Sequence, residues 1–426
     1  LDMGVRSQRQ WLKQLEKGLD QFITQAGIPN SLMHSLREVP DHIRTLNQQV
    51  SLCWPLVLDL IGESDRLRFE FGRMPDSLRD LLETMRSPIL PIVQCLDKLN
   101  DLLQKSLDPK EDSEIGRDIA ESWQAPIGMM LSRAEAMSEA LSWLAGEETA
   151  EQIPVARWLS RSPYGDDSDI IISASPISVA AQLRRNLWER AYGAVVTSAT
   201  LTALDSFHTL QWESGLPDWA HYERVASPFN YAELGELEAV NLASDPKSDQ
   251  FQSDVQTWLS EHVNLDEGTL VLFSSRAQLD ATREFFIRDW YQSLLSQNYL
   301  PKADIVKRHK ERIDSGKGSI IFGLASFAEG IDLPGDYLKH VVIVKIPFAV
   351  PDDPIHAAVG EWMESRGRNP FMELTLPAAS IRLIQACGRL IRKETDRGRV
   401  SILDKRLTTS RYGQLLLNSL PPFKRV

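Results

Sequence analysis

Short β-branched runs that alternate with helical patterns dominate the chain after Gly146 and constrain its fold more than any other feature. Strands that alternate with helices are joined by right-handed crossovers, so the pattern predicts an α/β fold with a mainly parallel sheet and helices on both faces. The predicted strands are Asp169–Ile172, Ala194–Thr197, Thr269–Phe273, Ala303–Val306, Ser319–Phe322, Val341–Ile346 and Val400–Leu403. Ligands of such sheets bind beyond the carboxyl ends of the strands, so functional residues are expected in the loops that follow these runs.

The first 150 residues follow a different pattern, because apolar residues recur at helical spacing and strand alternation is scarce. Apolar stripes of this kind are typical of helices that pack into a core. The three stripes are Trp11, Leu15, Leu19, Phe22 and Ile23; Ile89, Val93, Leu96 and Leu103; and Met130, Ala134, Met137, Leu141 and Leu144. With 16 Lys and Arg against 24 Asp and Glu, the region is predicted to be an acidic, all-helical domain with a net charge of −8.

The charge of the chain is unevenly distributed. Its total of −12 argues against a general nucleic-acid binder, but residues 380–426 carry 11 Lys and Arg against 3 Asp and Glu. This basic end is either a solvated face or a surface that faces phosphate. In the second case the expected phosphate contacts outside any motif are Lys405, Arg406 and Arg411.

Several classes of protein are disfavoured by what the sequence lacks. No apolar run reaches the length of a membrane span, and the N-terminus lacks the pattern of a signal peptide, so no membrane association is expected. The cysteines Cys53, Cys95 and Cys387 show neither metal spacing nor a disulfide framework. No metal ligands are therefore predicted within the chain, and a reducing cytoplasm fits this cysteine usage.

The stretch QACGRLIR, residues 385–392, places Arg389 and Arg392 three positions apart in a segment that is otherwise small or apolar. On a helix these side chains share one face. Two guanidinium groups that point the same way suit a cluster of anionic oxygens, because arginine binds carboxylate or phosphate through two parallel hydrogen bonds. The alternative is that both arginines pair with nearby acidic residues.

Two of the loops that follow predicted strands contain hydroxyl side chains. In VVTSATL, residues 195–201, Ser198 and Thr200 flank an alanine, and a helix N-cap is the simplest explanation for them. In LVLFSSRAQLD, residues 270–280, the strand ends at Ser274, Ser275 and Arg276, where a helix begins. Helix N-termini with hydroxyl groups bind phosphate oxygens readily.

A third loop lies in IIFGLASFAEGIDLPG, residues 320–335. An ordinary turn accounts for its glycines, but less readily for two carboxylates around one of them. Glycine allows close backbone approach, and the acids can accept hydrogen bonds from a ribose, an amide or an arginine. The candidate residues are Ser326, Glu329, Gly330, Asp332 and Gly335.

Taken together and in this order, four stretches resemble conserved motifs of the superfamily 2 helicases. They are TSAT at 197–200 for motif III, LFSS at 272–275 for motif IV, SFAEGIDLPG at 326–335 for motif V and QACGRLIR at 385–392 for motif VI. The wording of LWERAYGAVVTSATLTALDSFHTLQWESGL at 187–216, SFAEGIDLPGD and DKRL at 404–407 is similar to the DinG branch of the XPD-like helicases. The resemblance covers about residues 160–426.

This resemblance implies a division into three parts. A helical arch-like domain would occupy residues 1–150. A remnant of the first RecA-like domain, which contains motif III, would occupy residues 151–216, and the second RecA-like domain would occupy residues 217–426. In such helicases the two RecA-like domains clamp ATP between them, and hydrolysis opens and closes the cleft along single-stranded DNA.

The resemblance also implies roles for the candidate residues. Arg389 and Arg392 match the arginines that stabilise charge on the transferred phosphoryl group, and Gln385 would orient the helix or the water network. The implied nucleotide-binding positions are Gly330, Asp332, Glu329 and Gly388. The implied DNA-binding or coupling positions are Ser198, Thr200, Ser274, Ser275, Arg276 and Ser326.

Other parts of a helicase are not found in this sequence. A phosphate loop needs Gly, four residues, Gly, Lys and then Ser or Thr, and SGKGS at 315–319 precedes a strand and has Gly after the Lys. There is neither an acidic box of the DEAH type nor the four clustered cysteines of an iron–sulfur site. We therefore expect this chain to be the C-terminal part of a longer helicase and to be inactive alone. ATP and Mg²⁺ would bind between this part and the missing first domain. A 4Fe–4S cluster is expected only in the missing upstream part.

The resemblance implies that the parent protein unwinds DNA in the 5′-to-3′ direction in repair or replication. It would bind single-stranded DNA and DNA forks, and its protein partners are unknown. Its expected location is the bacterial cytoplasm, in association with the nucleoid. The alternative is a non-catalytic DNA- or protein-binding module that uses the same surfaces.

Overall fold

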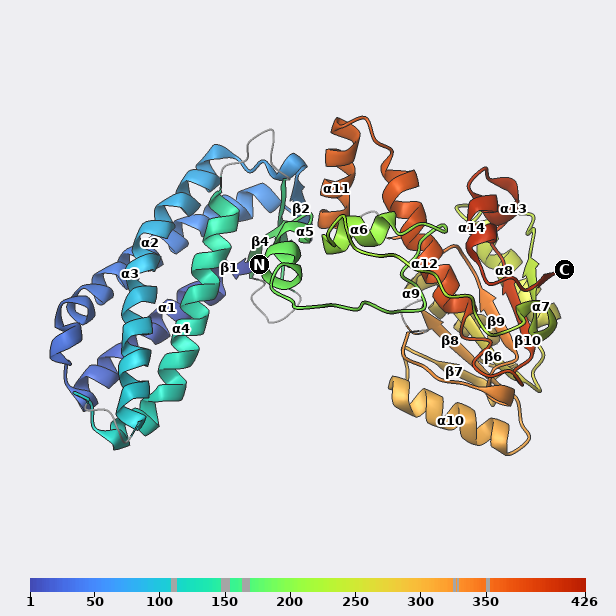
Figure 1. Cartoon of the computed structure of the whole chain (residues 1–426), viewed down its shortest axis with the longest axis horizontal. Helices are drawn as coiled ribbons and strands as arrows, with labels where there is room; N and C mark the ends of the chain where they lie inside the picture. Colours follow the sequence, from blue (N-terminus) through green and yellow to red (C-terminus); the bar gives the residue numbers. More distant parts are fainter. Residues whose placement is uncertain (109–112, 147–153, 163–168, 325–326, 328, 350–352) are drawn as a thin grey trace. The chain divides into compact units, whose positions relative to one another are not determined.

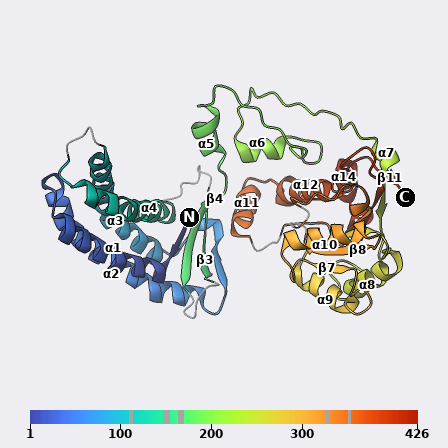
Figure 2. The same cartoon turned by 90° about the horizontal axis from the view of Figure 1, so that it is seen from below.

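The computed structural model describes residues 1–108, 113–146, 154–162, 169–324, 327, 329–349 and 353–426. The chain forms two compact units. Unit 1 comprises Leu1–Ile177 and Pro351–Gly367, and unit 2 comprises Ser178–Val350 and Arg368–Val426. The chain therefore leaves unit 2, contributes one segment to unit 1 and then returns to complete unit 2 (Figures 1 and 2).

Four long helices form the body of unit 1. They are α1 (Val5–Ala26), α2 (Met33–Ile61), α3 (Asp76–Leu107) and α4 (Arg117–Ala145), with short 3₁₀ turns η1 (Asn30–Leu32) and η2 (Glu70–Gly72). Consecutive helices pack side by side (Figure 1). Trp11, Leu15, Leu19 and Phe22 are buried along α1, which confirms the helical period of the first stripe.

A four-stranded antiparallel sheet completes unit 1. Its strands lie in the order β1–β4–β3–β2, with bounds β1 Asp2–Gly4, β2 Arg66–Phe69, β3 Val155–Arg161 and β4 Ile170–Pro176. The buried Asp169 accepts hydrogen bonds from the backbone N–H groups of Arg6 and Ser7 and thereby caps α1. The sequence did not predict the short strands β1 and β2.

The core of the helices continues into this sheet. Leu159 in β3 and Ile170 and Ile172 in β4 belong to the same buried cluster as the four helices. The compact unit therefore does not end at residue 150. The assignment of 151–216 to a first RecA-like domain stays a prediction.

The helix α11 (Pro354–Ser365) is the segment that the C-terminal part of the sequence contributes to unit 1. Its Glu361 lies with Oε1 2.5 Å from Nη1 of Arg68 in β2, and its Oε2 accepts a hydrogen bond of 2.8 Å from the backbone N–H of Phe71. Phe71 has a φ of +51°, in the left-handed region that is costly for a side chain. One carboxylate thus holds both a strand and a strained turn.

Unit 2 is built on a parallel sheet, which has seven strands within the described residues. The order is β11–β5–β10–β9–β6–β8–β7, with bounds β5 Gly235–Ala239, β6 Gly268–Phe273, β7 Leu294–Ser296, β8 Ser319–Leu324, β9 His340–Ile343, β10 Gly398–Ile402 and β11 Lys424–Arg425. All pairings between these neighbours are parallel. The predicted parallel α/β fold is confirmed.

Helices cover both faces of this sheet, as expected from alternating side chains along buried strands. In β6, Leu270 and Leu272 join one buried cluster, whereas Val271 and Phe273 join the other. The covering elements are α8 (Gln250–His262) and α9 (Arg276–Phe286) on one face, and α10 (Lys302–Asp314), α12 (Leu376–Cys387) and α14 (Gly413–Ser419) on the other.

The remaining elements of unit 2 are short. They are α5 (Ala180–Leu183), η3 (Arg184–Trp188), α6 (His208–Ser214), α7 (Tyr231–Leu234), η5 (Gly335–Tyr337), η6 (Phe371–Thr375) and α13 (Arg406–Thr409). None of the described helices combines the length and apolar character that a membrane crossing requires.

Two of the predicted strands are wrong. Ala303–Val306 lies in α10, because Ile305 and His309, four residues apart, are both buried on one face of a helix. Ala194–Thr197 is exposed, has no regular secondary structure and pairs with no strand of the described chain. An isolated run lacks the backbone partners that a strand needs.

We predict that Glu361→Ala loosens α11, because the substitution removes the ion pair with Arg68 and leaves the Phe71 N–H without its acceptor. The free energy of local opening should fall by about 1–3 kcal/mol, seen as roughly 5- to 150-fold faster hydrogen exchange of α11 amides. Glu364→Ala, at an exposed position of the same helix, is the control. Equal exchange in both variants would show that α11 is held by other interactions.

Candidate functional site

Arg389 and Arg392 lie in turns after a helix and not within one. Helix α12 ends at Cys387, and the backbone N–H groups of Arg389 and Leu390 bond to carbonyls three residues back. Such bonds tighten the end of a helix. The expectation that both arginines lie on one helical face is therefore wrong. Gly388 has an ordinary φ of −67°, and a Cβ there would lie 3.1 Å from the Ile384 carbonyl oxygen.

Arg389 is half-buried and only partly satisfied by the protein. Its Nη1 donates to the Ile331 carbonyl at 3.1 Å, whereas its Nε is buried and finds no hydrogen-bond partner in the part of the chain that the structure describes. Burial lowers the pKa of the Arg389 guanidinium, as does the nearby Arg392, while Glu329 and Asp332 raise it. Arginine still stays charged near neutral pH. The Nε–H of Arg389 could donate a hydrogen bond to an oxyanion that binds beside it.

Arg392 has one weak acidic partner among the described residues. Its Nε lies 3.9 Å from Oδ1 of Asp332, whose side chain is 74% exposed. A solvent-exposed pair at this distance holds the side chains only loosely. Among the described residues neither arginine is firmly paired with an acid, and there the two guanidinium groups leave donors free for an anionic ligand.

The loop after β8 lies beside these arginines through the Ile331 carbonyl. Gly330 has a φ of +68°, a conformation that a side chain would strain, so the glycine is needed for the turn itself. Lys302 donates to the Glu329 carbonyl, and the carboxylates of Glu329 and Asp332 belong to exposed residues. Ser326, also predicted as a site residue, lies outside the described residues.

Asp396 joins this loop to the arginine loop and was not predicted by the sequence. It is 1% exposed, its Oδ1 accepts from the backbone N–H of Gly335 at 3.0 Å, and its Oδ2 accepts from those of Arg392 and Lys393 at 2.7 and 2.9 Å. The sequence signal was weak, because an acid just before a strand is an ordinary turn residue. Its burial is what distinguishes it.

Gln385 and Thr200, far apart in sequence, are brought together within unit 2. The Gln385 side-chain amide donates to the Thr200 hydroxyl at 3.4 Å, and the Ser198 hydroxyl accepts from the backbone N–H of Thr200 at 3.3 Å. The structure begins no helix at these residues, since the next one, α6, starts at His208. The N-cap explanation for Ser198 and Thr200 is therefore wrong.

Ser274, Ser275 and Arg276 lie at the N-terminus of α9, beyond the carboxyl end of β6. The Ser275 hydroxyl accepts from the backbone N–H of Gln278 at 3.3 Å and caps the helix. Ser274 and Arg276 are exposed. Capping thus occupies Ser275 and leaves the other two side chains available for a ligand.

The basic residues after β10 are largely engaged within the protein. Arg406 binds the buried Asp404 through Nε at 2.9 Å and Nη2 at 2.6 Å, and Lys405 donates to the Ala243 carbonyl at 2.9 Å. The hydrogen bonds to Asp404 raise the pKa of Arg406. For these two residues internal pairing describes the structure, while Arg411 is exposed.

The three cysteines do not resemble metal ligands. Burial raises the pKa of Cys53 and Cys387 to about 12 and that of Cys95 to about 11, so each stays a thiol. The described residues contain no cluster of His, Cys, Asp and Glu that could hold a metal ion.

Comparison with known proteins gives this arrangement a context. Residues 259–423 match the family described as helicase C-terminal domain. The chain is 40% identical over 365 residues to the ATP-dependent DNA helicase DinG of Photobacterium profundum, which covers 84% of this chain and 52% of that protein. It is 34% identical over 419 residues to the protein of the same description from Escherichia coli K12, which covers 96% of this chain and 56% of that protein.

The fold is similar to that of a solved structure. The structure of S. tokodaii Xpd4 matches with a TM-score of 0.50 and 13% identity, covering all of this chain and 71% of that one. This likeness concerns the fold alone. The chain spans about half the length of the curated relatives it matches.

We predict that Asp396→Ala destabilises unit 2 by about 2–5 kcal/mol, because three backbone N–H groups lose their acceptor at a buried position. Asp396→Asn, which keeps one acceptor oxygen, should have an intermediate effect. Urea denaturation followed by tryptophan fluorescence measures the change, with the exposed neighbour Glu394→Ala as control. A midpoint of Asp396→Ala equal to that of the control would refute the proposed bridge.

Proposed function

We propose that this chain, which belongs to the DinG-like helicases of the XPD type, supplies the second RecA-like domain and an arch-like helical region of an ATP-dependent DNA helicase. In this proposal, residues 217–426 form that RecA-like domain, residues 151–216 are a remnant of the first, and residues 1–150 form the arch-like region. The activity of the whole protein is inferred from relatives that this chain covers only in part.

The observation that carries the proposal is the incomplete pairing of Arg389. Its buried Nε has no acceptor among the described residues, although its Nη1 is anchored on the Ile331 carbonyl. An anchored guanidinium with an unused donor is suited to bind an anionic oxygen that arrives with a ligand. The residues present therefore fit the phosphates of ATP.

When bound, ATP with Mg²⁺ would supply the phosphoryl group whose transfer to water releases the free energy for movement along DNA. Arg389 and Arg392 would donate hydrogen bonds to the phosphate oxygens and stabilise their charge. Gln385 would couple nucleotide binding to the position of Thr200, to which it donates a hydrogen bond. The loop that contains Glu329, Gly330 and Asp332 would couple the two arginines to DNA binding. Gly388 would allow the close turn beside the arginines.

The DNA contacts proposed for this chain are Ser274, Arg276 and Ser326, with Ser198, Ser275 and Thr200 as coupling or supporting residues. Sequence-independent binding needs contacts to phosphate, which hydroxyl and guanidinium groups supply. We propose single-stranded DNA and DNA forks as substrates, unwinding in the 5′-to-3′ direction, and a role in repair or replication in the bacterial cytoplasm. A 4Fe–4S cluster does not fit the buried cysteines of this chain and would need ligands from elsewhere in the parent protein.

A non-catalytic DNA- or protein-binding module is the second candidate. It is favoured by one observation, namely that the sequence contains neither a phosphate loop nor an acidic box. Phosphoryl transfer requires the loop, the metal and the arginines together. We therefore expect no ATPase activity from the 426-residue chain alone, with or without single-stranded DNA.

The test is steady-state ATPase activity in a longer protein that joins this chain to a phosphate loop. Arg389→Ala or Arg392→Ala should lower kcat by roughly a thousandfold, as expected for arginines that act on the transferred phosphoryl. KM for ATP should change far less, because other residues hold most of the nucleotide. The control is Arg288→Ala, at an exposed arginine outside the motifs. Full activity in both site variants would sink the catalytic proposal and favour the binding module.

A further inference from the structure

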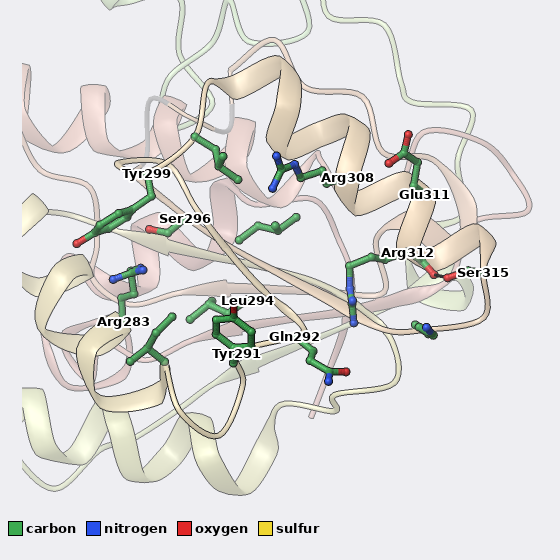
Figure 3. Close-up of a pocket in the computed structure, with 14 residues that line it drawn as sticks. Arg283, Tyr291, Gln292, Leu294, Ser296, Tyr299, Arg308, Glu311, Arg312 and Ser315 are labelled. Carbon is green, nitrogen blue, oxygen red and sulfur yellow. Dashed lines mark hydrogen bonds between the residues drawn. The ribbon is translucent and has the colours of Figure 1, made fainter.

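A pocket along the edge of the parallel sheet lies apart from the residues discussed so far (Figure 3). It has a volume of about 650 Å³ and is lined by the end of α9, the edge strand β7 and helix α10. This volume is in the range of small-molecule sites and exceeds what a bare phosphate or sulfate ion requires. The floor includes Leu294 and Leu295 of β7, so it is partly apolar.

The rim of the pocket carries positive charge without matching acids. Arg283, Arg308 and Lys317 line it, against a single carboxylate, Glu311. Within the described chain, the side chains of Arg308 and Lys317 form neither an ion pair nor a hydrogen bond, and both residues are exposed. Arg312 also lines the pocket, but it is anchored on the Gly318 carbonyl at 3.1 and 3.2 Å.

Two tyrosine rings border the same pocket. Tyr291 is 74% exposed and Tyr299 is 53% exposed, although large aromatic side chains are usually buried. The guanidinium carbon of Arg283 lies 3.5 Å from the centre of the Tyr299 ring, so the charge of Arg283 lies against this ring. Exposed aromatic rings beside free cations are the usual surface for stacking a nucleic-acid base.

A buried hydroxyl adds an independent sign of a missing ligand. Ser296 of β7 lines the pocket (Figure 3) and is 4% exposed, and its Oγ has no hydrogen-bond partner within the described residues. A hydroxyl buried without a partner costs free energy that a ligand atom would recover. Ser296 can donate to or accept from a polar atom of a ligand that rests on the apolar floor.

We propose that this edge pocket binds one nucleotide unit of a single DNA strand, an inference that rests on the proposed action of the chain on DNA. The phosphate lies against Arg308 and Lys317, and the base stacks on Tyr291 or Tyr299 with an edge toward Ser296. A peptide added to the sheet edge is less suited, because β7 is only three residues long and offers few free backbone groups. The pocket therefore extends the strand's path beyond the predicted motif residues.

The experiment uses the 426-residue chain and a short oligothymidylate that contains 5-bromodeoxyuridine. Irradiation should crosslink the oligonucleotide to Tyr291 or Tyr299, as mapped by mass spectrometry. Arg308→Gln with Lys317→Gln should reduce this crosslink and flatten the dependence of log affinity on log salt by about 0.7, the change expected for one phosphate that is no longer neutralised. Tyr291→Ala combined with Tyr299→Ala should weaken affinity roughly tenfold. The control, Arg288→Gln with Lys247→Gln, removes the same charge from exposed positions outside the pocket.

The other outcomes separate this inference from the proposed function. If the chain binds the oligonucleotide but the pocket and control variants have equal salt slopes and no crosslink maps to the pocket, only the pocket inference is overturned. If the chain does not bind the oligonucleotide at all, the proposed DNA contacts fail as well. If thymidine monophosphate prevents the crosslink as effectively as an unlabelled strand does, the pocket binds a free nucleotide. If an acidic peptide prevents it more effectively than the strand, the pocket binds a protein. Either result contradicts a strand site.

Discussion

The buried carboxylate of Asp396 is the group on which the geometry of the candidate site depends. It accepts hydrogen bonds from the backbone of Gly335 on one loop and of Arg392 and Lys393 on the other. Because the carboxylate is shielded from water, these bonds are costly to lose, and the two loops behave as one piece. Arg389 adds a second link through the Ile331 carbonyl. The positions of both guanidinium groups follow from these two links.

Carboxylates with a similar role occur elsewhere in the chain, and they change the meaning of its acidic composition. Asp169 caps α1 from far along the sequence, Asp404 holds Arg406 and the Ile346 backbone, and Glu361 holds α11 on the strand and turn of unit 1. These acids act inside the fold as acceptors, so they contribute to the net charge of −12 without forming an acidic surface. The net charge alone therefore does not describe the charge that the surface of the molecule carries.

The sequence predicted what depends on local periodicity and on strand order. The strands at β6, β8, β9 and β10 and the helices around them are present, because buried parallel strands appear as short apolar runs. The sequence did not predict features that depend on contacts between residues far apart in the chain. Ala194–Thr197 has the composition of a strand but no pairing neighbour, Asp396 resembles an ordinary turn residue until its burial is known, and α11 shows no sequence sign that it belongs to unit 1. The roles of the site residues remain predictions.

The central claim is that the guanidinium group of Arg389 itself acts on a phosphate oxygen, and chemical rescue tests it most directly. The measurement is ATPase turnover of the Arg389→Ala variant in a longer protein with a phosphate loop, as ethylguanidinium is added at concentrations far below those that unfold proteins. The account predicts that turnover rises with ethylguanidinium and that ethylammonium, of equal charge, restores much less, since it lacks the planar fork. A folded variant that binds ATP but gains no turnover from ethylguanidinium would contradict the claim and reduce Arg389 to an anchor for the Ile331 carbonyl.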